Sequence, residues 1–427
     1  MKKIKELSLT IYIILNLIYI SLGSMLFTIK KIKYIDYSRG YIILLILNIL
    51  VLLAVFIIKK HKNKIKLNII DLALLMIILF SIISVVFSIN KNVSIFGFKG
   101  RYEGLITILY YFSIFMISTY IDKQQKKIIS YAIILSGIIN LLYGVFQIFE
   151  LEGIIIKYNW NRPWATGFVN NPNFFGTLML LCLTYSLGLF IDETRLSLKI
   201  INGLLIFIFM IGLLISNAMS CLVGLIIIII CISIYTIIKR KYIKLLILIL
   251  VLSTSTFLII KADKTKLVRD FIKTKNQTIE IVKGNIEDNY GTNRIFIWKN
   301  TLKIVPDNML TGVGIDNFYY AFGKQPLYDG KWVFDKAHNE YLQILVTEGI
   351  FSLLSYLLFY GIITIKGLKN SFKDKQLYLV LPIIGYLTQA FFNISVIEVA
   401  PFFYIALGLL VDRGINNEES KRNNTST

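Results

Sequence analysis

The chain has 427 residues, of which 56% are hydrophobic and 17% charged, with a formal net charge of +21 and a mean hydropathy of +0.69. Repeated apolar runs of roughly 17 or more residues exclude an ordinary soluble domain and indicate a polytopic helical membrane protein. A transmembrane β-barrel would show short alternating segments instead. The positive charge does not indicate a nucleic-acid partner, because the basic residues cluster in short connectors between apolar runs.

The apolar runs predict about twelve transmembrane helices, each long enough to cross roughly 30 Å of hydrocarbon. We therefore expect an all-α integral membrane protein in which one long polar loop, near residues 261–337, precedes the tenth span. The predicted spans lie near residues 7–29, 40–58, 69–89, 104–121, 128–149, 173–191, 199–215, 218–238, 242–260, 339–365, 376–392 and 397–411.

The distribution of Lys and Arg predicts the orientation of the chain in the membrane. If the N-terminus is cytoplasmic, the cytoplasmic connectors carry 24 Lys and Arg residues, the short outer loops carry nine and the long loop carries 13. Because basic residues favour the cytoplasmic side, we expect both termini inside and the long loop outside. The first outer loop, with four basic residues, opposes this bias. Chemistry in the outer loops would be extracytoplasmic.

The long loop ends at a histidine that is the best candidate for proton chemistry. His338 begins the tenth predicted span, and the only other histidine, His61, lies in a lysine-rich connector. An imidazole with an ordinary pKa of about 6.5 can accept or release a proton near neutral pH. The alternative interpretation is a histidine that only caps a helix or anchors an interface.

Two shorter outer loops combine arginine with glycine and aromatic residues. In residues 96–104, Arg101 could present a cation at the membrane surface, or it could anchor the loop among lipid headgroups. In residues 160–173, Arg162 lies between two tryptophans, and its planar fork of donors suits phosphate oxygens. The alternative for this second loop is a structured turn without a ligand, with Asn173 as a possible N-cap of the next span.

The long loop contains further candidate elements. Arg294 starts a segment in which Ile297, Thr301 and Ile304 share one helical face, which predicts an amphipathic helix on the membrane surface. Residues 312–318 read as a turn that needs glycine. Glu348 lies inside the tenth predicted span, and we expect it to face the helix bundle in a structural role. The three cysteines lie in apolar spans, and no Cys/His spacing typical of a metal site is present.

These motifs follow one another in an order that resembles a known family. The motifs are Arg162…Gly167…Asn171-Pro172-Asn173, Arg294…Trp298, Gly312-Val313-Gly314 and His338-Asn339-Glu340. Their order, on a frame of about twelve spans with one long outer loop before the tenth, resembles the O-antigen ligase and O-antigen polymerase superfamily. The stretch Arg101-Tyr102-Glu103-Gly104 also resembles a form found in members from Gram-positive bacteria.

The resemblance implies a GT-C type membrane glycosyltransferase that needs no metal or other cofactor. Such an enzyme transfers a glycan from an undecaprenyl-diphosphate-linked donor to an acceptor hydroxyl on the extracytoplasmic face of the cell membrane. By position in the motifs, His338 would be the base that activates the acceptor. Arg162 and Arg294 would hold the diphosphate, and Arg101 would be a further candidate for this role. Arginine suits a diphosphate leaving group, and a hydroxyl becomes a good nucleophile only when a base removes its proton.

The resemblance also implies a division of the chain. Residues 1–159 would hold the first five spans, and residues 160–365 would form the ligase-like core with its outer loop. Residues 366–411 would hold the last two spans, and residues 412–427 a polar cytoplasmic tail.

The composition leaves the acceptor and two other functions open. Its richness in Ile, Lys and Asn suggests an AT-rich, Gram-positive source, which favours glycan polymerisation or ligation to a surface acceptor other than a lipid A core. Partners would be the lipid-linked donor, the hydroxyl acceptor, membrane lipids and other polysaccharide-assembly proteins. The alternatives are a lipid-linked oligosaccharide flippase or transporter and a non-catalytic component of polysaccharide assembly.

Overall fold

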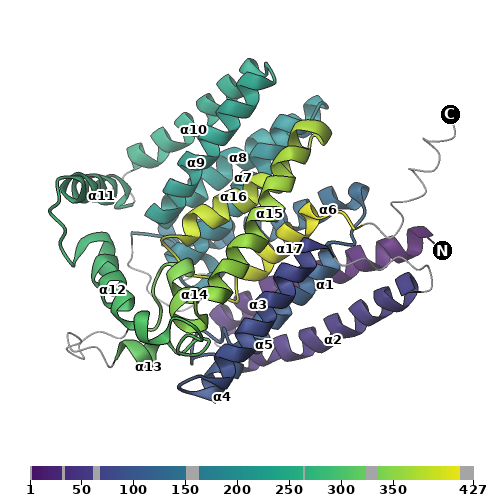
Figure 1. Ribbon diagram of the computed structural model, residues 1–427. Helices are drawn as coiled ribbons and strands as arrows, with labels where there is room; N and C mark the ends of the chain where they lie inside the picture. Colours follow the sequence, from purple (N-terminus) through teal and green to yellow (C-terminus); the bar gives the residue numbers. More distant parts are fainter. Residues whose placement is uncertain are drawn as a thin grey trace.

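The computed structural model describes residues 2–30, 34–60, 68–150, 163–262, 265–323 and 334–413, and every regular element within these ranges is helical. Among the described residues, nine helices are long and apolar enough to cross a membrane. They are α1 (Lys2–Lys30), α2 (Tyr34–Lys60), α3 (Ile69–Val86), α6 (Lys123–Ile148), α7 (Pro172–Asp192), α8 (Leu196–Ser216), α9 (Met219–Ile238), α10 (Tyr242–Ala262) and α15 (Ile350–Asp374) (Figure 1).

Three further apolar helices occupy the places of the fourth, eleventh and twelfth predicted spans. These helices, α5 (Leu105–Ser118), α16 (Leu377–Ala390) and α17 (Ala400–Leu410), are shorter than the nine others. The all-helical membrane architecture is therefore confirmed, with nine full-length candidates rather than twelve.

The tenth predicted span is two helices instead of one. A break at Gly349 separates α14 (Glu340–Glu348) from α15. Gly349 has a φ of +87°, and a Cβ added there would lie 2.4 Å from the backbone carbonyl oxygen of Leu310. Only glycine tolerates this backbone conformation beside so close a neighbour, so the apolar run cannot continue as one helix.

Glu348 ends α14 and is buried against neighbouring helices. Its carboxylate accepts hydrogen bonds from Ser81 of α3 at 2.6 Å and from Ser352 of α15 at 2.9 Å. These contacts satisfy a polar group that would otherwise be costly to bury. The expected position facing the bundle is confirmed.

The fully buried helix α7 forms the centre of the bundle. It packs against α6, α8, α9 and α16. Asn171 caps its start by accepting a hydrogen bond from the Asn173 amide at 2.9 Å, and Pro172 takes the first helical position. The predicted cap at Asn173 is thus wrong by two residues, because proline is favoured at the first position of a helix and pushes the cap before it.

The connectors predicted to be cytoplasmic meet at one end of the bundle. Asp71 at the start of α3 forms an ion pair with Arg413, which follows α17. Lys244 at the start of α10 donates to the backbone carbonyl oxygens of Ile191 at 2.6 Å and Glu193 at 3.0 Å, where α7 ends.

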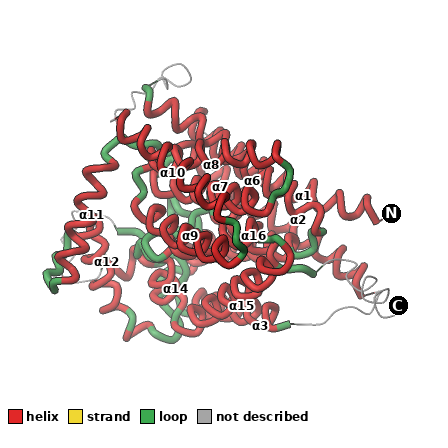
Figure 2. Tube along the Cα trace, turned by 90° about the horizontal axis from the view of Figure 1, so that it is seen from above, coloured by secondary structure: helices red, strands yellow, loops and turns green. Residues whose placement is uncertain are grey.

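The opposite end carries short helices that are not candidate spans. They are α4 (Lys91–Phe96), α11 (Leu267–Val282), α12 (Tyr290–Ile304) and α13 (Phe318–Phe322), with single 3-10 turns at η2 (Gly167–Val169) and η3 (Pro306–Asn308). Figure 1 places α12 and α13 beside α14, with α11 farther away near α10, and Figure 2 shows α11 and α12 to one side of the bundle.

Protein covers the predicted apolar face of the helix that begins at Arg294. Ile297, Thr301 and Ile304 are buried, and Ile297 and Ile304 belong to a small apolar core shared with α13 and α14. The predicted face is real, but it packs against protein. Its partners include Val313, Phe318, Phe322, Ala337 and Val346.

Candidate functional site

The backbone around His338 is held on both sides of the residue. We call residues 334–339 the histidine loop. The carbonyl of Ala337 accepts a hydrogen bond from Trp298 Nε1 at 3.0 Å, and its amide donates to Gln343 Oε1 at 2.8 Å. Asn339 caps the start of α14 with its side chain. The position of His338 is therefore fixed by α12 on one side and α14 on the other.

His338 itself adopts an unusual backbone conformation. Its φ of +50° lies in the left-handed region, which residues other than glycine rarely adopt and which recurs at functional sites. The imidazole is half-buried. Burial, followed by the nearby cations of Arg294 and Arg101, lowers the pKa of His338 to about 4, and Asp335 opposes this effect. The imidazole is thus neutral at neutral pH and is flanked by positive charge.

Arg101 reaches the histidine loop from the loop between α4 and α5, residues 97–104, which we call the arginine loop. Its Nε lies 2.6 Å from Asp335 Oδ2, and its Nη2 lies 3.3 Å from Asp335 Oδ1. Burial alone would raise the pKa of Asp335, but the Arg101 guanidinium outweighs burial and holds that pKa below its ordinary value. Arg101 also lies 5.8 Å from the ring centroid of Phe174, so the start of α7 adjoins the site.

Arg294 reaches the same site from α12. The three residues before it have left-handed backbone angles, which turn the chain just ahead of the arginine. Its Nε donates to the carbonyl of Phe392 at 3.1 Å, and its Nη1 donates to the carbonyl of Gly291 at 2.9 Å and to Thr292 Oγ1 at 2.7 Å. The guanidinium is therefore held by two backbone carbonyls and a hydroxyl rather than by a carboxylate, and its charge stays uncompensated by these contacts.

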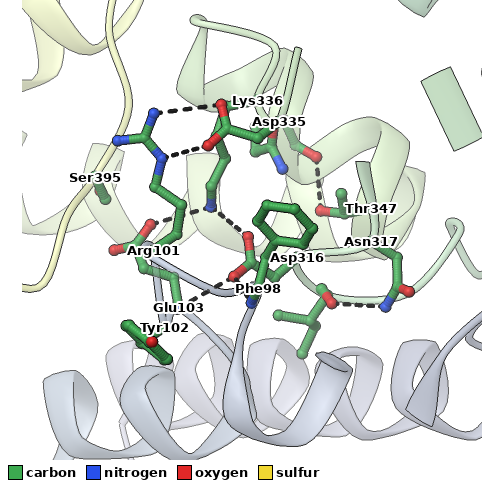
Figure 3. A network of polar contacts seen from close by, with 12 residues as sticks. Phe98, Arg101, Tyr102, Glu103, Asp316, Asn317, Asp335, Lys336, Thr347 and Ser395 are labelled. Atoms are coloured by element: carbon green, nitrogen blue, oxygen red, sulfur yellow. Dashed lines mark hydrogen bonds and ion pairs between the residues drawn. The ribbon is translucent and has the colours of Figure 1, made fainter. Parts of the chain in front are cut away.

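A buried ion-pair network joins the histidine loop to the arginine loop (Figure 3). Lys336 Nζ lies 2.7 Å from Asp316 Oδ1 and 3.3 Å from Glu103 Oε2. Asp316 Oδ2 accepts hydrogen bonds from the backbone amides of Phe98 at 2.6 Å and Glu103 at 3.2 Å. Glu103 Oε1 accepts from the hydroxyl of Tyr111 at 2.9 Å. Segments more than 200 residues apart are thereby fixed side by side.

Electrostatics make Asp316 the main partner of Lys336. Burial alone would lower the pKa of Lys336, but the carboxylates of Asp316 and Glu103 outweigh it and hold that pKa above its ordinary value. Burial raises the pKa of Glu103 to about 8, although Lys336 offsets part of this effect. Glu103 therefore binds a proton near neutral pH more readily than an exposed carboxyl group, while Asp316 is the closer anion.

Residues of this network line a small cavity of about 50 Å³. Glu103, Lys336, Glu340 and Glu348 contribute to its lining. A volume of this size admits a few water molecules but not a sugar ring.

The structure brings together three of the four predicted site residues. Arg101, Arg294 and His338 are close enough for both arginines to act on the imidazole, whereas Arg162 lies outside the described residues. No group of three or more His, Cys, Asp or Glu side chains that could hold a metal ion lies in the described part of the chain.

Sequence reasoning missed the anionic half of the site. Asp335 and Lys336 lie three and two positions before His338, and Glu103 follows Arg101 by two positions, so proximity to predicted residues was the available signal. Asp316 carried a different signal, since it follows the glycine turn at residues 312–314. The glycines of that turn are required: Gly312 and Gly314 have φ values of +68° and +104°.

Comparison with known proteins gives one family match. Residues 178–357 match the family model described as O-antigen ligase. The matched stretch includes Arg294 and His338 and runs from α7 into α15. A search of curated proteins finds no match to the chain.

Proposed function

We propose that the chain is a metal-independent membrane glycosyltransferase of GT-C type, because residues 178–357 match the family model described as O-antigen ligase. Its donor would be an undecaprenyl-diphosphate-linked glycan, and its acceptor a hydroxyl of a growing glycan or of another surface molecule. The proposal rests most on one observation, which is that Arg101, Arg294 and His338 converge from three distant segments. A base flanked by two guanidinium groups suits a reaction in which a hydroxyl is deprotonated beside a departing diphosphate.

In the proposed reaction His338 accepts the proton of the acceptor hydroxyl. The hydroxyl oxygen forms a new bond to the anomeric carbon of the donor glycan while the bond from that carbon to the diphosphate oxygen breaks. The electron pair leaves with undecaprenyl diphosphate, and Arg294, Arg101 and Arg162 stabilise its developing charge. Displacement in one step inverts the anomeric configuration. The proton returns from His338 to solvent or to the leaving diphosphate.

The test of this proposal uses purified protein in detergent, undecaprenyl-diphosphate glycan from the source organism, and EDTA. We expect the donor to be consumed at the same rate with and without the chelator. Progressively longer glycans would identify a polymerase, and a single transfer to a separate acceptor would identify a ligase. A rate that collapses in EDTA would contradict metal independence. Donor that stays intact would instead favour a flippase or a non-catalytic assembly component.

We expect Arg294→Lys and Arg162→Lys each to lower transfer by roughly tenfold or more. An ammonium group keeps the charge but cannot reproduce the planar fork, and a hydrogen bond to a charged group contributes about 1.5–3 kcal/mol. Initial rates at several donor concentrations measure the effect. Arg269→Lys on α11 is the matched control, since it makes the same exchange away from the site. Wild-type rates in both site variants would show that Arg162 and Arg294 do not hold the diphosphate.

The proposed orientation has both termini in the cytoplasm and the site on the outer face. We expect a reporter enzyme fused after Arg294 to be active only outside the cytoplasm, because the basic connectors favour the cytoplasmic side. A second fusion after Lys239 in a basic connector should give the opposite result. A cytoplasmic signal from the first fusion would reverse the topology.

A further inference from the structure

The Arg101–Asp335 pair has the form that a diphosphate contact would take. The carboxylate uses both of its oxygens, at 2.6 Å from Nε and 3.3 Å from Nη2, on one edge of the guanidinium. Phosphate oxygens bind arginine through the same two-pronged geometry. Arg101 therefore cannot offer this edge to a donor until Asp335 leaves it.

Arg101 and Arg294 differ in this respect. Arg294 contacts only backbone carbonyls and one hydroxyl among the described residues, so no anion competes for it there. The side chains of Arg101 and Asp335 are 22% and 20% exposed, so the pair is accessible to an incoming anion. Arg294 is therefore open to an anion, whereas Arg101 is held by the carboxylate of Asp335.

Asp335 also stands close to the base in the chain and in electrostatic effect. It precedes His338 by three residues in a loop fixed by Lys336 and Ala337. The charged groups that act on His338 are Arg294 from α12, Arg101 from the arginine loop, and Asp335 and Lys336 from its own loop. Asp335 is the one anion among these four, and at present it is paired with Arg101.

We propose that Asp335 occupies Arg101 in place of the donor diphosphate. When the donor binds, it displaces Asp335 from Arg101, and the freed carboxylate then acts on His338. This inference rests on the proposed function, because it assumes that Arg101 binds the diphosphate. Once displaced, the carboxylate is no longer compensated by the guanidinium and stabilises the protonated imidazole more strongly. The base then accepts a proton readily only when a donor is in place, which limits futile loss of the activated glycan to water.

The test exploits the presence of only two histidines. In a His61→Gln background, protein labelled with ¹³C-histidine gives one imidazole signal, from His338, which can be titrated with and without inorganic pyrophosphate. We expect pyrophosphate to raise the titration midpoint of His338. This part needs no variant at Asp335. An unchanged midpoint while pyrophosphate is bound would overturn the inference.

Asp335→Asn separates competition from a purely structural role. We expect this variant to bind pyrophosphate roughly threefold to tenfold more tightly by calorimetry, because the competing charge is removed. With lipid-linked donor, both KM and kcat should fall. Asp288→Asn is the matched control, since it removes a carboxylate from the exposed pair with Lys299, and it should bind pyrophosphate as tightly as the wild type does. Asp335→Glu keeps the charge and should also retain the wild-type affinity for pyrophosphate.

The possible results separate the inference from the proposed function. Equal or weaker pyrophosphate binding by Asp335→Asn would overturn the inference alone and assign Asp335 to holding the loop. Absence of pyrophosphate binding by the wild-type protein would overturn the diphosphate site and the inference with it.

Discussion

Replacement of His338 by alanine is expected to lower kcat for glycan transfer by about 10²- to 10⁴-fold, which is the usual contribution of a positioned general base. The substitution removes the imidazole but keeps the backbone hydrogen bonds of Ala337 and the side-chain cap of Asn339 that hold the loop. Protein level in the membrane should therefore remain unchanged. Initial rates of transfer, normalised to purified protein, measure the loss.

The pH profile provides a second readout for the same variant. A base must be unprotonated in the free enzyme, and the lowered pKa of about 4 keeps His338 neutral across the neutral range. We expect kcat/KM of the wild-type protein to stay level down to about pH 5 and to fall as His338 is protonated below that. In the alanine variant, kcat/KM should no longer show this fall at low pH. His61→Ala is the matched control, and transfer by His338→Ala near the wild-type rate would show that His338 is not the base.

The membrane architecture could be predicted from sequence because long apolar runs carry a local signal. Each of the nine long helices falls on a predicted span. The break at Gly349 was not predicted, since it depends on a tertiary contact, the carbonyl of Leu310. Hydropathy records how apolar a segment is and does not record where a neighbouring backbone approaches it.

The helix at residues 294–304 shows the same limit for segments outside the predicted spans. Its apolar face was predicted correctly, but a sequence pattern cannot distinguish lipid from protein as the surface that covers such a face. Here the small core formed by α12, α13 and α14 buries Ile297 and Ile304. Tertiary packing, rather than the helical pattern, decides the partner.

The sequence singled out the histidine and arginines of the candidate site but not its carboxylates, for a physical reason. Histidine and arginine in the loops between spans are uncommon enough to be noticed, whereas Glu103, Asp316 and Asp335 have the appearance of ordinary solvated carboxylates. Their role arises only when loops 233 residues apart meet, as Glu103 and Lys336 do. Pairing over such a distance leaves no periodic signal in the sequence.

Lys336→Met is expected to be the most destabilising single change near the site. The methionine fills a similar volume but leaves Asp316, whose side chain is fully buried, as an uncompensated anion. Removal of one partner from a buried ion pair costs about 3–5 kcal/mol, whereas an exposed pair contributes about 0–1 kcal/mol. In thermal unfolding experiments in detergent, the Tm of this variant should fall by a large amount. The Tm of Lys299→Met, which breaks the exposed pair with Asp288, should change little.

The double variant Lys336→Met with Asp316→Asn distinguishes an unpaired charge from lost packing. Asparagine keeps an acceptor for the amides of Phe98 and Glu103 but carries no charge. We expect it to recover much of the stability lost in the single variant, because the electrostatic cost disappears when both charges are absent. A single variant as stable as the wild type would mean that the buried Asp316 side chain does not depend on its ion pair with Lys336. In that case the network would have to hold His338 through packing and backbone hydrogen bonds alone.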